Sequence, residues 1–266
     1  MVQELPRSDS GHLSDGGRGL VAVVSGASSG GIGGAVARRL ASRGYALHLG
    51  SSDVDASLST TVATCEGLGV PVSSGRYDFR NPSEAVRFVL EGVDFHGHID
   101  ALVNNAAMRN HKGYLEYTLD ELEELWAVNF HALFLAGQEA ARAMKGQGFG
   151  RIVNVASQMA IVTARGLSVY SATKAAILSL TRSMAVELAD HGIRVNAVSP
   201  GPVGSDYVVE ALSADTAFRE YLVDRTAVRR LGHPDEIAEV IEFLLTSQGD
   251  FMLGHNVVVD GGFIIQ

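Results

Sequence analysis

Short apolar runs alternate along this chain with longer segments in which apolar residues recur every three or four positions. Short runs are typical of strands buried on both faces, and the longer spacing is typical of helices. The pattern predicts strands at 20–25, 45–50, 70–77, 99–104, 151–156, 193–198 and 256–259. Helices are predicted at 33–43, 53–68, 82–96, 118–145, 168–190 and 234–246, with a less regular one at 205–223.

Strand–helix–strand units repeated in this way require right-handed crossovers and a parallel sheet with helices on both faces. The predicted fold class is α/β, a Rossmann-type doubly wound parallel β-sheet flanked by helices in a single domain over 20–266. Such folds bind ligands beyond the C-terminal ends of their strands. Residues 1–19, rich in Gly, Ser and Asp, are predicted to form a flexible leader without chemistry.

Composition narrows the possible partners and the location. The chain has 266 residues, 46% of them hydrophobic, which suffices for a substantial core. Its formal net charge of −9 disfavours nucleic acid and anionic membranes as partners. Because Cys65 is the single cysteine, no disulfide is possible within the chain. We interpret Cys65 as a packing residue. No signal peptide or spanning segment is predicted, and we expect a cytoplasmic protein.

A glycine-rich segment joins the first predicted strand to the first predicted helix. Glycines at such a turn let the backbone approach a pyrophosphate, and the N-terminus of the helix favours its negative charge. We predict dinucleotide binding here, although a purely structural turn is the alternative. The expected contacts are Gly26, Ser28, Ser29, Gly31, Ile32 and Gly33.

The end of the second predicted strand bears on the choice of dinucleotide. An acidic residue there would bind the ribose 2′-hydroxyl of NAD, and a basic residue the 2′-phosphate of NADP. The expected contacts are Ser51 and Ser52, which belong to neither type. Their hydroxyls favour NADP, whereas Asp53 would serve NAD if the turn were one residue longer.

Three polar side chains stand where a structural explanation is incomplete. Tyr170 and Lys174 are four residues apart and share the apolar face of a predicted helix. A lysine on that face is costly unless it is used or paired, or unless it extends to solvent. Asn129 interrupts the apolar face of helix 118–145, where it could also cap a loop. Ser157, taken alone, is an ordinary serine at a strand end.

Together these residues resemble the short-chain dehydrogenase/reductases, in particular 3-oxoacyl-reductase-like members, over about residues 20–263. Ser157 lies thirteen residues before Tyr170, as in that family. The segments at 104–107, 200–205, 230–234 and 260–262 also match, as does Asp78 after the third strand. The resemblance implies an NAD(P)-dependent oxidoreductase that interconverts an alcohol and a ketone or aldehyde.

The same resemblance implies a role for each residue. Tyr170 would be the general acid or base, and Ser157 would hold the substrate oxygen. Lys174 would bind the nicotinamide ribose and favour the phenolate of Tyr170, while Asn129 would anchor a water leading from Lys174 to solvent. Tyr170 and Lys174 thus count among the cofactor contacts as well. Further implied cofactor contacts are Asp78, Phe79, Asn105, Ala106, Pro200, Gly201, Val203 and Ser205.

The sequence departs from the family pattern in its glycine loop. The family spaces these glycines as Gly-x-x-x-Gly-x-Gly, whereas Gly26, Gly31 and Gly33 leave one residue more. It is therefore open which of Ser28, Ser29 and Gly30 faces the phosphates. The insertion also keeps open one alternative, a lyase or dehalogenase on the same scaffold. A second alternative, a cofactor-sensing regulator that has lost the reaction, is disfavoured by the intact set of Asn129, Ser157, Tyr170 and Lys174.

The substrate side is less defined by the sequence. Expected contacts are Ser157, Gln158, Met108 and Tyr207, with a lid over 205–228 and no metal site. The mostly apolar set favours a neutral alcohol or carbonyl compound, unless Arg109, His111 or Lys112 turns inward. Small residues on helices 118–145 and 168–190, together with the family resemblance, lead us to expect a homotetramer.

Overall fold

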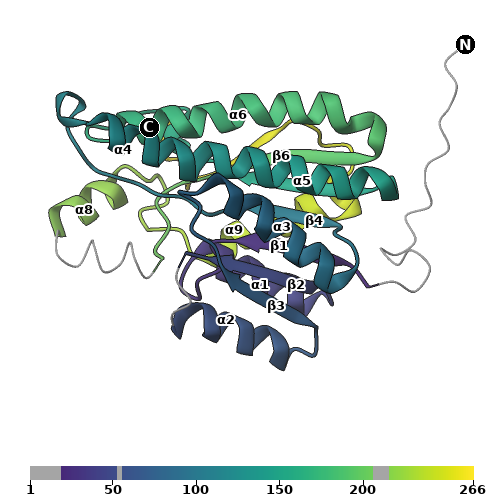
Figure 1. Ribbon diagram of the computed structural model, residues 1–266. Helices are drawn as coiled ribbons and strands as arrows, with labels where there is room; N and C mark the ends of the chain where they lie inside the picture. The colour runs from purple at the N-terminus through teal and green to yellow at the C-terminus, as the bar shows by residue number, and fades with distance from the viewer. Residues whose placement is uncertain (1–18, 53–55, 206–215) are drawn as a thin grey trace, which may run out of the picture.

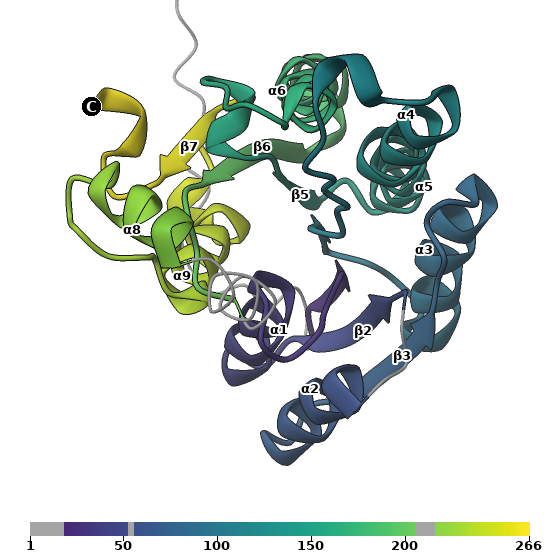
Figure 2. The ribbon, with the colours of Figure 1, turned by 90° about the vertical axis from the view of Figure 1, so that its left-hand side faces the viewer.

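Seven parallel strands form one sheet in the computed structural model, which describes residues 19–52, 56–205 and 216–266. The strand order is β3-β2-β1-β4-β5-β6-β7. From β1 to β3 the chain adds strands toward one edge of the sheet, and from β4 to β7 it adds them toward the other edge (Figure 2). The predicted doubly wound architecture is confirmed. The strands are β1 Val21–Ser25, β2 Ala46–Ser51, β3 Val72–Arg76, β4 Ala101–Asn104, β5 Gly150–Val155, β6 Ile193–Pro200 and β7 Asn256–Val259.

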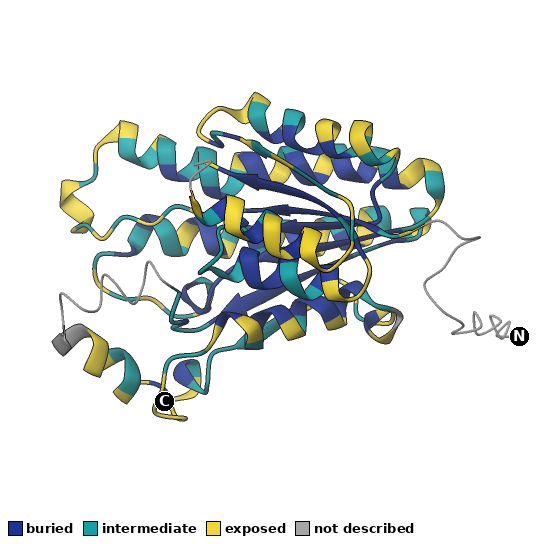
Figure 3. Cartoon of the chain, turned by 90° about the horizontal axis from the view of Figure 1, so that it is seen from below, coloured by how far each residue is buried: buried dark blue, intermediate teal, exposed yellow. Residues whose placement is uncertain are grey.

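Helices cover both faces of the sheet (Figure 1). Successive residues of β1 point to opposite faces, so Val24 packs in one core and Val23 in the other. The first core is covered by α1 Ile32–Ser42, α2 Ala56–Gly67 and α9 Pro234–Leu245. The second is covered by α3 Pro82–His96, α5 Ala132–Gln147 and α6 Ser168–Leu188. The five inner strands are therefore almost wholly buried, the edge strands β3 and β7 are partly exposed, and each helix exposes its outer side (Figure 3).

Cys65 belongs to the first of these cores. Its side chain is fully buried on α2, and burial raises the pKa of the thiol to about 11. The thiolate needed for nucleophilic chemistry is therefore not populated at neutral pH, which agrees with the packing role predicted from the sequence. Among the described residues, no helix combines the length and the apolar character that crossing a membrane demands.

The predicted helix 118–145 is interrupted. It consists of α4 Leu119–Trp126, a π-helical turn at Ala127–His131, and α5. In the turn, the amide of Ala132 donates to the carbonyl oxygen of Ala127, five residues earlier. One extra residue in a turn rotates the side chains on either side of it, and such turns concentrate at functional sites. Asn129 lies inside this turn.

The connections at the carboxyl edge of the sheet carry short helices. The loop after β4 leads through a 3₁₀ turn at Tyr114–Glu116 to α4. A 3₁₀ turn at Gln158–Ala160 follows β5 directly. After β6, the first part of the predicted lid, residues 206–215, lies outside the described residues. The remainder contains α8 Thr216–Asp224.

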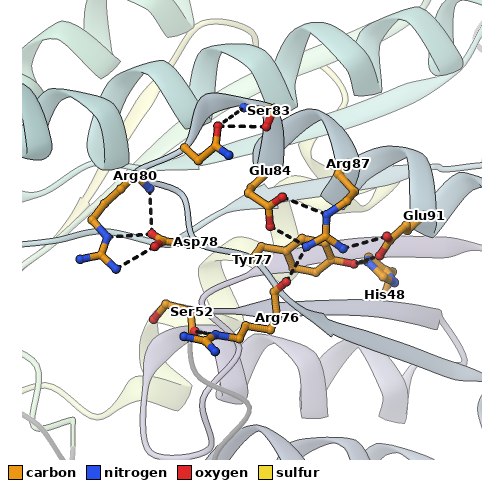
Figure 4. Close-up of polar contacts among 11 residues, drawn as sticks. His48, Ser52, Arg76, Tyr77, Asp78, Arg80, Ser83, Glu84, Arg87 and Glu91 are labelled. Carbon is orange, nitrogen blue, oxygen red and sulfur yellow. Dashed lines mark hydrogen bonds and ion pairs between the residues drawn. The ribbon is translucent and has the colours of Figure 1, made fainter.

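A chain of polar side chains between β2, β3 and α3 leads from buried His48 and Tyr77 to Glu91 at the surface (Figure 4). The Tyr77 hydroxyl donates to Glu91 at 2.5 Å and lies 2.9 Å from Nε2 of His48. Since that hydroxyl has one proton, Nε2 of His48 is the donor of the second bond. Nδ1 of His48 then accepts from Ser73 at 2.8 Å. His48 is thus neutral, and burial lowers its pKa to about 4.

This histidine is expected to make the fold sensitive to acid. Below its ordinary pKa of 6.5, the unfolded chain binds a proton at His48 that the folded chain does not bind until about pH 4. As the pH drops from about 6.5 to about 4, the free energy of unfolding should therefore decrease, and this residue should account for up to roughly 3 kcal/mol of the decrease. Urea unfolding of the wild type and of His48→Gln, followed across this range, isolates the effect. An identical pH dependence in both proteins would contradict the assignment.

Candidate active site

The glycine turn after β1 is shaped by close backbone contacts. Gly26 has a φ of +67°, and a Cβ there would lie 2.8 Å from Nδ2 of Asn105. A Cβ on Gly33 would overlap the carbonyl oxygen of Gly26. Asn105 bridges the carbonyls of Ser25 and Gly26 through Nδ2, at 3.0 Å each. The turn thus presses the first turn of α1 against the end of β1, beside the segment that follows β4.

The inserted residue is accommodated within a turn over 28–31. The amide of Gly31 donates to the carbonyl of Ser28 at 3.2 Å, and Gly31 caps α1. The amide of Ser29 donates to the Ser57 hydroxyl at 2.8 Å, which draws Ser29 toward α2. Ser28 instead lines the groove beside the turn. Of the two serines, Ser28 is therefore the one placed to face a ligand.

Glycine is expected to be required at position 33 and not at position 31. In Gly33→Ala the added methyl group must push α1 away from β1, which typically costs 1–3 kcal/mol or more. In Gly31→Ala the nearest atom would be 3.6 Å away, and φ is −106°. Titration of NADPH fluorescence should show at least about tenfold weaker binding for Gly33→Ala alone. Equal affinities for the two variants would contradict this account of the turn.

Two adjoining cavities open at the carboxyl edge of the sheet, one of about 290 Å³ and one of about 720 Å³. The smaller contains the candidate catalytic residues, and the larger is a groove from the glycine turn to the end of β3. Because both share Tyr170, they form one continuous site. The residues common to both are Gly31, Asn105, Ala107, Arg109 and Tyr170.

Tyr170, Lys174 and Ser157 line the smaller cavity together. Tyr170 and Lys174 lie on the first turns of α6, and Ser157 follows β5. Lys174 is buried, and its Nζ donates to the carbonyl of Val155 at 2.8 Å. The same Nζ lies 5.8 Å from the centroid of the Tyr170 ring. The three side chains predicted from the sequence therefore meet in one cavity.

Burial dominates the electrostatics of Tyr170 and Lys174. Burial raises the pKa of Tyr170, and the Ser157 hydroxyl and the positive charge of Arg109 only partly oppose the rise. Burial also lowers the pKa of Lys174 to about 7. Desolvation is the largest influence on both groups, and the expectation that Lys174 favours the phenolate of Tyr170 stays a prediction. At neutral pH Tyr170 is a protonated phenol.

Asn129 is fixed by three hydrogen bonds. Its Oδ1 accepts from the amide of Met108 at 2.8 Å, and its Nδ2 donates to the carbonyl of Met108 at 2.9 Å. The third bond runs from Nδ2 to the hydroxyl of Thr173, at 3.1 Å. The amide on the apolar stripe therefore joins the loop after β4 to α6. The water that it was expected to anchor stays a prediction.

The expected cofactor contacts lie along the larger groove and its continuation, with the exception of Ser29 and Gly33. Asp78 is held by Arg80 through both carboxylate oxygens, and the Ser51 hydroxyl lies 3.4 Å from that of Ser28. Groove residues predicted from the sequence are Gly26, Ser28, Gly31, Ser51, Ser52, Asp78, Phe79, Asn105 and Ala106. Ile32, Pro200, Gly201, Val203 and Ser205 line the catalytic cavity.

The expected substrate contacts are mostly placed together. Gln158, Met159 and Ala164 line the catalytic cavity, and Met108 lines the adjoining groove. Tyr207 lies outside the described residues. Tyr221 and Leu222, which belong to the predicted lid segment, close the cavity from α8, and Phe263, which sequence reasoning missed, closes it from the C-terminal end. The position of Phe263 depends on long-range packing that no local pattern indicates.

Of Arg109, His111 and Lys112, which the sequence allowed to turn toward the substrate, only Arg109 lies at the site. Arg109 lines both cavities. Lys112 is paired with Glu121 at 2.7 Å, and the ring of His111 lies against Gly166. Sequence reasoning also missed a second cation in the groove, Arg76, because it considered only the residues after the second strand.

The residues present fit a nicotinamide dinucleotide. The glycine turn leaves no room for a Cβ at Gly26 or Gly33, and it opens the groove at the N-terminus of α1. That geometry is suited to a pyrophosphate. At the far end of the site, the buried amine of Lys174 makes a single hydrogen bond among the described residues, to Val155. It therefore has donors left for a bound ligand.

Comparisons with known proteins give relatives over nearly the whole length of the chain. A family model described as enoyl-(acyl carrier protein) reductase matches residues 26–264. An L-rhamnose 1-dehydrogenase (NAD(P)(+)) of Sphingomonas sp. (strain SKA58) is 35% identical, over 93% of this chain and 97% of its own. A gluconate 5-dehydrogenase of Gluconobacter oxydans (strain 621H) is 32% identical, over 93% and 95%. A solved structure, a candidate 2-deoxy-D-gluconate 3-dehydrogenase of Agrobacterium tumefaciens with bound NADP, superposes with a TM-score of 0.85 at 30% identity, covering 94% of this chain and 98% of that one.

Proposed function

The chain belongs to the short-chain dehydrogenase/reductase family, and from this premise we propose that the cavity of Ser157, Tyr170 and Lys174 is its active site. The protein is an NAD(P)-dependent oxidoreductase that interconverts an alcohol and a carbonyl compound. A regulator or lyase is not favoured. The observation that carries the site assignment is the meeting of a phenol, a hydroxyl and a buried amine beside the glycine groove.

Tyr170 transfers the proton of the reaction. A nicotinamide cofactor in the groove supplies or accepts the hydride. Because burial keeps Tyr170 protonated at neutral pH, the phenol donates its proton to the substrate oxygen during reduction. During oxidation the phenolate takes the proton back. Ser157 donates a hydrogen bond to the same oxygen and holds it next to Tyr170.

Lys174 and Asn129 support this transfer. One N–H of Lys174 is used on Val155, and the others are available for the cofactor ribose and for water. In its protonated form, Lys174 stabilises the phenolate of Tyr170 through its positive charge. Asn129 fixes the backbone of Met108 at the cavity wall. We propose that it also anchors the water through which Lys174 exchanges protons with solvent.

The cofactor contacts follow the groove from one end to the other. The glycine turn, with Ser28 and the N-terminus of α1, binds the pyrophosphate. Asp78 and Phe79 would hold the adenine end of the cofactor, and Asn105 and Ala106 would contact a ribose of the cofactor in the middle of the groove. The nicotinamide end is formed by Pro200, Gly201, Val203 and Ser205.

The lining of the catalytic cavity favours a polyhydroxylated substrate. Oε1 of Gln158 is buried without a hydrogen-bond partner among the described residues. A buried acceptor left unpaired costs about 1–3 kcal/mol, which a substrate hydroxyl would recover. Arg109, which forms no ion pair with any described residue, adds positive charge for a carboxylate. We therefore propose a sugar or sugar acid, which is also what the rhamnose and gluconate dehydrogenases are named for.

An assembly of four copies in the cytoplasm completes the proposal. A groove between α5 and α6 exposes Phe134, and Val186 is 77% exposed on α6. Apolar surface of this kind is typical of an interface between subunits. Light scattering of the purified protein measures the number of copies.

The proposed function is tested with the purified protein and a substrate panel. Aldoses, aldonates and simple neutral alcohols are each offered with NAD and with NADP, and the absorbance of the reduced cofactor is followed. Turnover of an aldose or aldonate, well above that of the simple alcohols, is expected. Preference for a simple alcohol would overturn the substrate class alone. The function would be overturned if no alcohol reduced either oxidised cofactor and no matching carbonyl compound oxidised either reduced cofactor.

A further inference from the structure

Arg76 is the last residue of β3 and lies opposite Ser51, the last residue of β2. Its Nε donates to the carbonyl of Ser52 at 2.9 Å, which holds the guanidinium beside the end of β2 (Figure 4). Arg76 lines the larger groove together with Ser28, Ser51 and Ser52. A cation and three hydroxyl-bearing residues therefore surround this corner of the groove.

The neighbouring arginines are already neutralised. Arg80 forms ion pairs with Asp78 at 2.7 Å and with Glu124 at 3.4 Å. Arg87 forms ion pairs with Glu84 and Glu91, both on α3. Arg76 forms no ion pair with any residue that the structure describes. Within the described residues its charge acts at longer range on the carboxylate of Asp78, which Arg80 already holds in an ion pair.

We propose that Arg76 recognises the phosphate on the adenine ribose of NADP and makes the enzyme prefer NADP to NAD. In a doubly wound sheet, the end of the second strand is where the 2′-position of this ribose is recognised. An arginine binds a phosphate through two parallel N–H bonds, and charge-assisted bonds of this kind are about twice as strong as neutral ones. Here the register between β2 and β3 supplies, from the next strand, the cation that the second strand itself lacks.

This inference rests on the proposed function and refines its cofactor. The bond from Nε to Ser52 orients the guanidinium in advance, so little side-chain freedom is lost when a phosphate binds. The hydroxyls of Ser28 and Ser51 lie 3.4 Å apart in a hydrogen bond with each other, and a phosphate oxygen could replace one of them as the acceptor. NAD carries a hydroxyl at this position of the ribose and therefore offers Arg76 no phosphate to bind.

The test measures binding and not turnover. Dissociation constants of NADPH, NADH, adenosine 2′,5′-bisphosphate and adenosine 5′-monophosphate are determined for the wild type, Arg76→Ala, Arg76→Lys and Arg142→Ala. Arg142 is an exposed arginine on α5, paired with Glu139, and its variant controls for the loss of one positive charge. The wild type is expected to bind NADPH at least about tenfold more tightly than NADH.

Arg76→Ala is expected to weaken NADPH and the bisphosphate by about tenfold or more, and NADH and the monophosphate by less than about threefold. Arg76→Lys should lie between, because an ammonium group lacks the paired donors. Retained NADH binding shows that the variant is folded. Equal affinity of the wild type for NADPH and NADH would overturn the proposal, as would an equal loss of both in Arg76→Ala. If the wild type bound no dinucleotide, the proposed function itself would fall.

Discussion

Tyr170→Phe is expected to lower kcat/KM by at least about 10²–10⁴-fold, while the dissociation constant of NADPH changes by less than about threefold. The substitution removes one oxygen atom from a ring that α6 holds in the catalytic cavity. Ser157 then still binds the substrate oxygen, but no group in contact with it can exchange a proton. Steady-state rates and fluorescence titration of the same preparations measure the two quantities.

Two comparisons make this result specific. Tyr114→Phe removes the same oxygen from a side chain that is 79% exposed, and it should leave both quantities unchanged. Ser157→Ala should retain more activity than Tyr170→Phe, since it loses a hydrogen bond and not the proton donor. If Tyr170→Phe turned over at a rate near that of the wild type, the proton would have to come from another group.

Much of the fold could be predicted because its signals are local. The helix at 82–96 and the strand at 256–259 match the structure at both ends. The helix has a proline in its first turn and a glycine at its end, which fix its boundaries. The parallel sheet followed from the alternation of strands and helices, since parallel strands require crossovers.

The interruption of helix 118–145 could not be predicted. Apolar residues continue through it at intervals of three and four, so the pattern gives no sign of an extra residue. The π-helical turn is held by tertiary bonds from Asn129 to Met108 and Thr173. Those partners are distant in the sequence, and only the folded chain brings them together.

The catalytic residues could be predicted from their chemistry. The residues that line the cofactor groove could be predicted only in part. Lys174 attracts notice in the sequence because a cation on an apolar stripe demands an explanation. Arg76 gives no such signal, since an arginine at a strand end is ordinary. Its importance comes from the register that places it beside Ser51. The raised pKa of Tyr170 likewise depends on burial, which the sequence does not specify.

Lys174→Met is expected to abolish most activity and yet to stabilise the fold. The wild-type protein buries this amine without a carboxylate partner, and its pKa falls from 10.5 to about 7. Such a shift corresponds to a penalty of roughly 4–5 kcal/mol, of which the lost hydrogen bond to Val155 would offset about 1–2 kcal/mol. Methionine fills a similar volume without the charge, so a net gain of about 2 kcal/mol is expected at neutral pH. Urea unfolding measures this gain, and steady-state rates measure the loss of activity.

The pH dependence of that gain distinguishes desolvation from better packing. Between about pH 7 and 10.5 the unfolded wild type holds a proton on Lys174 that the folded protein has released. The penalty is therefore largest below pH 7 and falls as the pH rises, and the advantage of Lys174→Met should shrink with it. Lys145→Met, at an exposed position on α5, should show neither effect. An advantage that stays constant up to about pH 10 would mean that Lys174 is folded in its charged form, held by a partner. A destabilised variant would mean that the amine contributes more to the fold through Val155 than its burial costs.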